Sequence, residues 1–129
     1  MVPIARTVLV SDDIPEQRQI YATLLEYSGF RVLEAPDGET TLRLGKAHLP
    51  NVLLLDLRMP DMSGCEVARL LKGDPRTAHI RIVMVSADAS VDARSRAAEV
   101  GCDAFVAKPA SPREILAAVQ HQIILSTRV

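Results

Sequence analysis

Short apolar runs alternate with longer amphipathic segments along this chain. The apolar runs are rich in Val, Leu, Ile and Ala, and they predict five strands, at Thr7–Val10, Arg31–Glu34, Val52–Leu55, Ile80–Val85 and Ala104–Ala107. Near-continuous apolarity is typical of parallel strands that are covered by helices on both faces. The pattern therefore predicts a buried parallel sheet.

The amphipathic segments predict five helices. They span Pro15–Tyr27, Asp37–His48, Gly64–Lys72, Ser90–Val100 and a last segment that begins at Pro112. Ser63 with Glu66, and Ser111 with Glu114, have the spacing of a capping box, which marks the start of the third and the last helix.

Apolar residues at helical spacing predict which side of each helix is buried. In the first helix they are Ile20, Leu24 and Tyr27, and in the last helix they are Leu116, Val119 and Ile123. We expect Gly45 to interrupt the second helix. The fourth helix offers mainly alanines to the core, so it should be the most thinly packed and the most mobile.

Strands that alternate with helices, joined by right-handed crossovers, predict an α/β fold. We expect a doubly wound, five-stranded parallel sheet with strand order 2-1-3-4-5, which is the flavodoxin-like (βα)5 arrangement. With 129 residues and no long Gly/Ser linker, the chain is sized for a single domain over residues 1–129.

Composition and charge exclude several classes of function. The net charge is -1 and the basic residues are scattered, which argues against direct nucleic-acid binding. Because no long apolar run and no secretory signal occurs, we expect a cytoplasmic protein that does not enter a membrane. Cys65 and Cys102 lack metal-ligand spacing and are expected to be reduced thiols, and His48, His79 and His121 are expected at the surface.

Polar residues follow four of the five predicted strands. Asp12 and Asp13 follow the first strand, Asp56 the third, Ser86 the fourth and Lys108 the fifth. Since the carboxyl ends of parallel strands meet at one edge of a sheet, and ligands bind beyond that edge, these side chains should form one site. The second strand lacks such a residue, which agrees with its place at the side of the predicted sheet.

Four blocks of sequence carry a resemblance to a known family. They are Val8 to Asp13, Leu54 to Gly64, Val85 to Ala87 and Phe105 to Pro109, in this order. The chain is similar, essentially from end to end, to the receiver domain of bacterial two-component response regulators (CheY-like). It departs from the usual pattern at Ser11, at Arg81 in place of a frequent proline, and at Phe105 in place of a switch tyrosine, and no departure removes a catalytic group.

The resemblance implies a role for each residue of the predicted site. Asp56 would accept a phosphoryl group from a histidine kinase or a histidine phosphotransfer protein. Asp12 and Asp13 would hold magnesium, and Ser86 and Lys108 would contact the phosphoryl group.

The chemistry of phosphoryl transfer agrees with these residue types. A carboxylate can form an aspartyl phosphate, and its attack on a charged phosphoryl group needs a cation to offset the repulsion. Mg2+ prefers about six oxygen ligands. Asp13 and Asp56 fit as direct ligands, together with the backbone carbonyl of Arg58, and Asp12 fits as a ligand through water. Lys108 supplies a further positive charge.

The resemblance also implies a conformational switch. Lys108 and Ser86 would be drawn toward the phosphoryl group, and Phe105, the switch aromatic, would turn into the room that Ser86 leaves. A downstream protein partner should read the resulting surface on the fourth helix, the fifth strand and the last helix. The kinase should dock near the mouth of the site, around Ile14, Pro15 and Pro109.

Arg58 and Asp88 suggest a further device at the site. They stand two residues after Asp56 and Ser86, respectively, so both should overhang the site mouth. Opposite charges there would pair as a lid that limits the approach of water to the phosphoryl group, or would stay two unrelated solvated charges.

Three functions remain open from the sequence. The first is a phosphorylatable receiver that acts alone, as a phosphorelay component or a protein-binding switch. The second is a receiver that is part of a larger regulator or hybrid kinase. In both cases the protein catalyses only its own phosphorylation and dephosphorylation.

The third function is an aspartate-dependent phosphatase of the haloacid dehalogenase type. Such an enzyme needs its nucleophile on the first strand and a second acid two residues later. Here Asp56 follows the third strand and Arg58 stands at the second position, so the spacing argues against this class.

Overall fold

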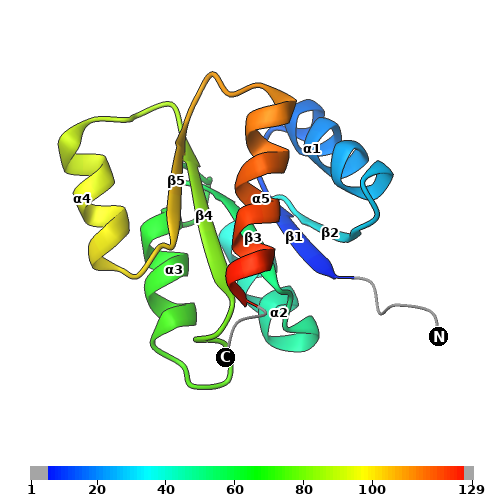
Figure 1. The fold of residues 1–129 in the computed structure, drawn as a ribbon. Helices are drawn as coiled ribbons and strands as arrows, with labels where there is room; N and C mark the ends of the chain where they lie inside the picture. Colours follow the sequence, from blue (N-terminus) through cyan, green and yellow to red (C-terminus); the bar gives the residue numbers. More distant parts are fainter. Residues whose placement is uncertain (1–5, 127–129) are drawn as a thin grey trace.

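A parallel sheet with helices on both faces forms the centre of the molecule (Figure 1). The computed structural model describes residues 6–126, so both ends of the domain predicted over residues 1–129 lie outside the described residues. The strands are ordered β2-β1-β3-β4-β5, which confirms the predicted strand order. They are β1 (Thr7–Ser11), β2 (Arg31–Ala35), β3 (Val52–Asp56), β4 (Arg81–Ser86) and β5 (Ala104–Ala107).

The helices lie in two layers, one on each face of the sheet. They are α1 (Pro15–Tyr27), α2 (Gly38–His48), α3 (Gly64–Lys72), α4 (Val91–Glu99) and α5 (Pro112–Ser126). α1 and α5 cover one face, and α2, α3 and α4 cover the other (Figure 1). Within residues 6–126, none of the helices has the length and apolarity that a membrane span requires.

The central strands are buried on both faces and feed two cores. Leu9 and Leu53 pack beneath α2, α3 and α4, whereas Val10 and Leu54 pack beneath α1 and α5. Burying one such aliphatic side chain contributes about 1.5 to 3 kcal/mol. The strand ends that carry the predicted site residues are therefore fixed by the best-packed part of the fold.

Several helices begin with a side-chain cap. Asp37, Ser63 and Ser90 each accept a hydrogen bond from the backbone N–H three residues later, and Ser111 does the same at the start of α5. One such cap typically contributes about 1 kcal/mol. The predicted starts of α3 and α5 are confirmed.

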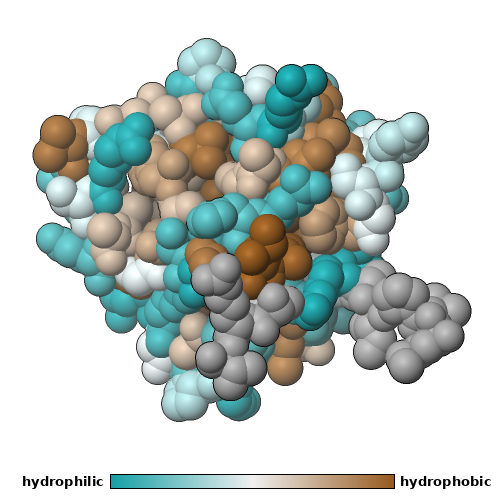
Figure 2. All heavy atoms as spheres, in the orientation of Figure 1, coloured by the Kyte–Doolittle hydropathy of each residue, from teal (hydrophilic) through white to brown (hydrophobic). Residues whose placement is uncertain are grey.

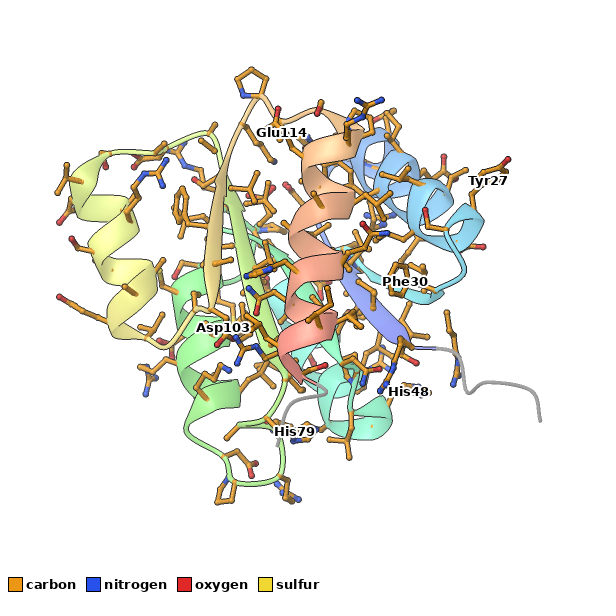
Figure 3. All side chains as sticks on the ribbon, viewed as in Figure 1. Tyr27, Phe30, His48, His79, Asp103 and Glu114 are labelled. Atoms are coloured by element: carbon orange, nitrogen blue, oxygen red, sulfur yellow. The ribbon has the colours of Figure 1, made fainter. Side chains whose placement is uncertain are left out.

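The buried side of α1 differs from the sequence prediction. Tyr21 and Leu25 are buried, whereas Ile20 is 55% exposed and Tyr27 is 93% exposed. Figure 3 shows Tyr27 pointing away from the sheet. The prediction was wrong because neighbouring stripes of α1 have the same helical spacing, and only packing against the sheet and α5 decides between them.

Gly45 does not interrupt α2, contrary to the prediction. The helix runs unbroken from Gly38 to His48, and Gly45 is buried against α3. A Cβ atom at this position would lie 3.4 Å from Leu71 Cδ2, which is an ordinary contact, so α2 has room here for a small side chain.

The buried side of α5 is only partly the predicted one. Ile115, Val119 and Gln122 are buried, while Leu116 and Ile123 are half-buried at the rim of the same core. The prediction missed Gln122 because a glutamine is buried only where another polar group satisfies its amide, and the helical spacing does not show such a partner.

Arg81 provides that partner at the amino edge of the sheet. Its Nε donates to Gln122 Oε1 at 2.8 Å, and its Nη1 lies 3.5 Å from Asp103 Oδ1. Asp103, at the start of β5 in Figure 3, also pairs with Lys72 Nζ at 3.0 Å. The residue that replaces a frequent proline therefore joins β4, β5 and α5.

α4 is thinly packed, as predicted. Its buried residues are Ala93 and Ala97, which are small. Cys65 and Cys102 are half-buried free thiols that pack against the same core. Burial raises the pKa of Cys102 to about 12, so this thiol is neutral near pH 7.

Two glycine substitutions should change stability in opposite directions. Gly45→Ala should stabilise the fold by about 0.5 to 1 kcal/mol, because alanine favours a helix interior and its Cβ meets only ordinary contact. Gly64→Ala should destabilise it by about 1 to 3 kcal/mol, because a Cβ there would lie 2.5 Å from the Asp56 carbonyl oxygen. Urea unfolding measures both changes, and a lower midpoint for Gly45→Ala would contradict the packing described for α2.

Candidate functional site

The predicted site residues meet at the carboxyl edge of the sheet. β1 and β3 are neighbours in register, with Ser11 opposite Leu55, so the residues that follow them lie side by side. Asp12, Asp13 and Asp56 each place one carboxylate oxygen within 4.8 Å of the other two. The sheet therefore gathers three acids from two segments of the chain.

The three carboxylates differ in burial. Asp12 is 2% exposed and Asp56 is 8% exposed, whereas Asp13 is open to solvent. Burial raises the pKa of Asp12 above its usual value, and the negative charges of Asp56 and Asp13 raise it further. The backbone N–H of Ile14, 2.9 Å from Asp12 Oδ1, and the charge of Lys108 act in the opposite direction. The cluster is electrostatically unfavourable without a cation.

Lys108 places its ammonium group among these acids. Its Nζ donates to Asp56 Oδ2 at 3.0 Å and lies 3.8 Å from Asp12 Oδ2. It also donates to Gln17 Oε1 at 2.9 Å. The backbone N–H of Lys108 donates to the Ser86 carbonyl at 2.8 Å, which ties the loop after β5 to the end of β4.

The loop after β3 holds the other side of Asp56. Asp56 Oδ1 accepts a hydrogen bond from the Arg58 N–H at 3.1 Å, and the Gly64 N–H donates to the Leu57 carbonyl at 2.7 Å. The Asp61 carboxylate accepts hydrogen bonds from two backbone N–H groups at the start of α2, which lower its pKa. The loop is thus clamped to α2 and α3.

A cavity of about 400 Å³ opens over Asp56. Asp13, Arg58, Ser86 and Lys108 also line it. Ser86 is buried, and its Oγ accepts a hydrogen bond from the Asp88 N–H at 3.0 Å. The cavity brings a carboxylate, an ammonium group and a hydroxyl together in a space open to solvent, which suits a phosphoryl group.

Phe105 lies on β5, on the same face of the sheet as Ser86. The register pairs Met84 with Phe105 and Ser86 with Ala107, and side chains two residues apart share a face. The Phe105 ring is half-buried, and the Arg94 guanidinium carbon of α4 lies 4.7 Å from its centroid. The ring is therefore covered by α4.

Arg58 and Asp88 line a second cavity, of about 490 Å³, beside the first. Within the described residues they do not form an ion pair, and the Asp88 carboxylate instead accepts from the Ser90 N–H at 3.1 Å. This hydrogen bond lowers the pKa of Asp88, and the charges of Arg58 and Arg96 add to the effect. The lid stays a prediction, tested by the lifetime of the phosphorylated protein in Arg58→Ala.

The histidines lie outside this site. His48, His79 and His121 are exposed, as predicted. Figure 3 places His48 and His79 at the end of the molecule opposite the loop that follows β5.

The sequence did not reveal Gln17 or Arg94 as part of the site. Gln17 stands in the first turn of α1, after the acid pair, and Arg94 stands in the first turn of α4, after Ser86. Helices that begin at the carboxyl edge of the sheet bring their first turns to the site. The positions of Gln17 and Arg94 near the start of such helices could therefore have indicated them.

Comparison with known proteins shows the family. A family model of the response regulator receiver domain matches residues 8–120. The chain belongs to the response regulator receiver domain family. The receiver is 37% identical over 114 residues to the phosphate regulon transcriptional regulatory protein PhoB of Pseudomonas aeruginosa, covering 88% of this chain and 50% of that protein. It is 32% identical over 111 residues to the polar-differentiation response regulator DivK of Brucella anthropi, covering 85% and 90%.

Solved structures show the same fold. The receiver superposes on the chemotaxis response regulator CheY4 of Vibrio cholerae with a TM-score of 0.87 at 25% identity, covering 92% of this chain and 99% of that one. A CheY-like receiver domain of Methanospirillum hungatei gives a TM-score of 0.90 at 24% identity, covering 95% and 97%. This receiver thus spans half of its PhoB relative and most of its DivK relative.

The acid cluster fits a magnesium ion. Mg2+ binds carboxylate oxygens and keeps several waters, so a partly open group of three acids offers suitable donors. Asp13 and Asp56 border the open cavity, whereas Asp12 is buried and one of its oxygens already accepts from Ile14. The expectation that Asp12 contributes through water stays a prediction.

Magnesium should stabilise this fold, because it offsets the repulsion between the carboxylates only in the native state. At about ten times the Kd, linkage gives about 1.4 kcal/mol, which should raise Tm by a few degrees. Asp13→Asn should lose most of the increase. Asp92→Asn, which removes an exposed carboxylate on α4, should keep it. Thermal melts at constant ionic strength test this, and an equal increase in all three proteins would contradict a site at the acid cluster.

Proposed function

We propose that Asp56 accepts a phosphoryl group from a histidine kinase or a histidine phosphotransfer protein. The observation that carries the proposal is the convergence of two acids and the Lys108 ammonium on Asp56, beneath an open cavity. Membership in the receiver family supports the same chemistry.

In the proposed step, a carboxylate oxygen of Asp56 attacks the phosphorus of a phosphohistidine. The P–N bond breaks, its electron pair stays on the imidazole nitrogen, and Asp56 becomes an acyl phosphate. Lys108, 3.0 Å from Asp56 Oδ2, is within reach of a phosphoryl oxygen, and the Ser86 hydroxyl lines the same cavity. Magnesium, when bound, neutralises the charge of the carboxylates and the phosphoryl group. Attack of water on the acyl phosphate then releases inorganic phosphate and returns the free carboxylate.

The proposed donor docks beside the mouth of the site. Ile14, at the mouth, is 47% exposed, and Ile20, further along α1, is 55% exposed. Both line an open groove of about 410 Å³ that reaches Pro112. Exposed apolar side chains next to the reacting carboxylate support docking around Ile14, Pro15 and Pro109.

The proposed switch connects Ser86 with Phe105. Ser86 would move toward the phosphoryl group and Phe105 would turn inward, away from the Arg94 guanidinium. A downstream protein would then read the changed α4, β5 and α5 face, where hydrophilic and hydrophobic side chains are interspersed (Figure 2).

The proposal leaves two settings for the receiver. In the first setting it acts alone, and this is supported by the match over 90% of DivK. In the second it is one domain of a longer protein, and this is supported by the match over 50% of PhoB. We place both in the cytoplasm, with no direct contact to nucleic acid or membrane by the receiver itself. The phosphatase alternative has lost its support, because the chain is a receiver and Asp56 ends β3 rather than β1.

Incubation with acetyl phosphate should add one phosphoryl group to the wild-type protein only when magnesium is present. Asp56→Asn should give no adduct, because it removes the accepting oxygen, and Asp61→Asn, in the same loop but outside the cluster, should still be phosphorylated. Intact-mass spectrometry follows the reaction, and a full adduct on Asp56→Asn would exclude Asp56 as the acceptor.

Arg94→Ala should favour the activated state, because the guanidinium covers Phe105 only while the ring is outward. A cation–π contact from an exposed arginine such as Arg94 contributes about 0.5 to 1 kcal/mol, so affinity for beryllofluoride, a phosphoryl mimic, should rise roughly two- to fivefold. Arg96→Ala is the matched control, because Arg96 pairs with Asp92. Fluorine NMR titration measures the affinities, and equal values for Arg94→Ala and wild type would argue against this coupling.

A further inference from the structure

Gln17 of α1 contacts the site lysine from outside the phosphoryl cavity. Its Oε1 accepts a hydrogen bond from Lys108 Nζ at 2.9 Å, across 91 positions of the sequence. Gln17 does not line the cavity over Asp56 but lines the open groove with Ile14 and Ile20. It is therefore placed to act on Lys108 without contacting the phosphoryl group.

A second hydrogen bond fixes the orientation of this amide. Gln17 Nε2 donates to the hydroxyl of Tyr21 at 3.0 Å, and the Tyr21 side chain is buried in the core beneath α1 and α5. An ammonium group has only donors, so the amide must present its oxygen to Lys108, and this leaves its NH2 group for Tyr21. The position of the amide is thus set by the core and not by the acid cluster.

The acceptors of Lys108 respond differently when a phosphoryl group arrives. Asp56 becomes an acyl phosphate and loses its carboxylate charge, and Asp12 belongs to the proposed magnesium site. Gln17 Oε1 is neutral, is held by Tyr21 and undergoes no change. It is the constant member of the set, so it can keep the ammonium group in place while the others change.

We propose that Gln17 is a positioning residue for phosphoryl transfer, which holds the Lys108 ammonium where a phosphoryl oxygen on Asp56 will need it. This inference rests on the proposed function. Without Gln17, the carboxylates of Asp56 and Asp12 are the remaining acceptors near Nζ, and they draw the ammonium deeper into the acid cluster. Phosphoryl transfer then requires the ammonium group to move back toward the phosphoryl oxygen.

The test compares three α1 variants with wild type. Gln17→Met keeps the length of the side chain and removes both hydrogen bonds, and Gln17→Glu keeps an oxygen acceptor for Lys108. Gln19→Met is the matched control, because Gln19 is an exposed glutamine of the same helix. It lines a different groove, beside Thr23 and Leu24, and Lys108 does not line that groove. Two readouts are used: the phosphorylation rate with acetyl phosphate and magnesium, and the 15N signal of the Lys108 ammonium, assigned by its loss in Lys108→Arg.

Gln17→Met should phosphorylate about two- to tenfold more slowly, as expected for loss of the hydrogen bond that holds Lys108, and should shift the ammonium signal. Gln17→Glu, which keeps an oxygen acceptor for Lys108, should phosphorylate faster than Gln17→Met, and Gln19→Met should match wild type in both readouts. If Gln17 only stabilised the fold, its substitution would not shift the Lys108 ammonium signal more than the other signals of the protein. If Gln17→Met fails to fold, Tyr21→Phe, which removes only the hydroxyl that orients the amide, should slow the reaction in the same direction.

Two results separate failure of this inference from failure of the proposed function. Wild-type rate and ammonium signal in Gln17→Met, or a wild-type rate in Tyr21→Phe where Gln17→Met does not fold, would overturn the role of Gln17. A wild-type protein that takes no phosphoryl group on Asp56 would overturn the proposed function, whatever the variants show.

Discussion

The crowding of three carboxylates around one lysine is the constraint on which the rest of this structure depends. The oxygens of Asp12, Asp13 and Asp56 lie within 4.8 Å of one another, and two of these acids are almost fully buried. Like charges at such distances are unfavourable in a partly buried site. The fold keeps them there because each follows a strand that is fixed by burial on both faces.

The acid cluster therefore lowers the stability of the fold, and burial of apolar side chains in the two cores offsets this loss. Several contacts around the cluster reduce the repulsion. Lys108 supplies a compensating charge within the cluster, and backbone N–H groups of Ile14 and Arg58 each bind one carboxylate oxygen. A bound cation would lower the repulsion further, and it would be needed more after phosphorylation, because an acyl phosphate carries more negative charge than the carboxylate it replaces. Clusters of like charge of this kind are typical of functional sites.

The sequence predicted the sheet and the place of the site well, for physical reasons. A strand buried on both faces is a continuous apolar run, and a parallel sheet brings the ends of its strands together. Asp56 and Lys108 could thus be placed in one site although 52 positions separate them.

Helix faces and side-chain partners were harder to predict. In α1 the stripe with Ile20 and the stripe with Tyr21 are equally periodic, and only tertiary packing selects the latter. Gly45 was taken as a helix breaker, but α2 is continuous through it, because burial of this part of the helix outweighs the low helix propensity of one glycine. Gln17 was missed because its role depends on the reach of one side chain to Lys108, and no sequence period encodes such a contact.

The position of the phosphoryl group in the chain can be read by chemical trapping. Borohydride reduces an acyl phosphate to an alcohol, so a phosphorylated aspartate becomes homoserine and can be located by peptide sequencing. We expect homoserine at residue 56, with Asp12 and Asp13 unchanged. Homoserine at residue 12 or 13, or a phosphoryl group retained on His48, His79 or His121, would contradict this expectation.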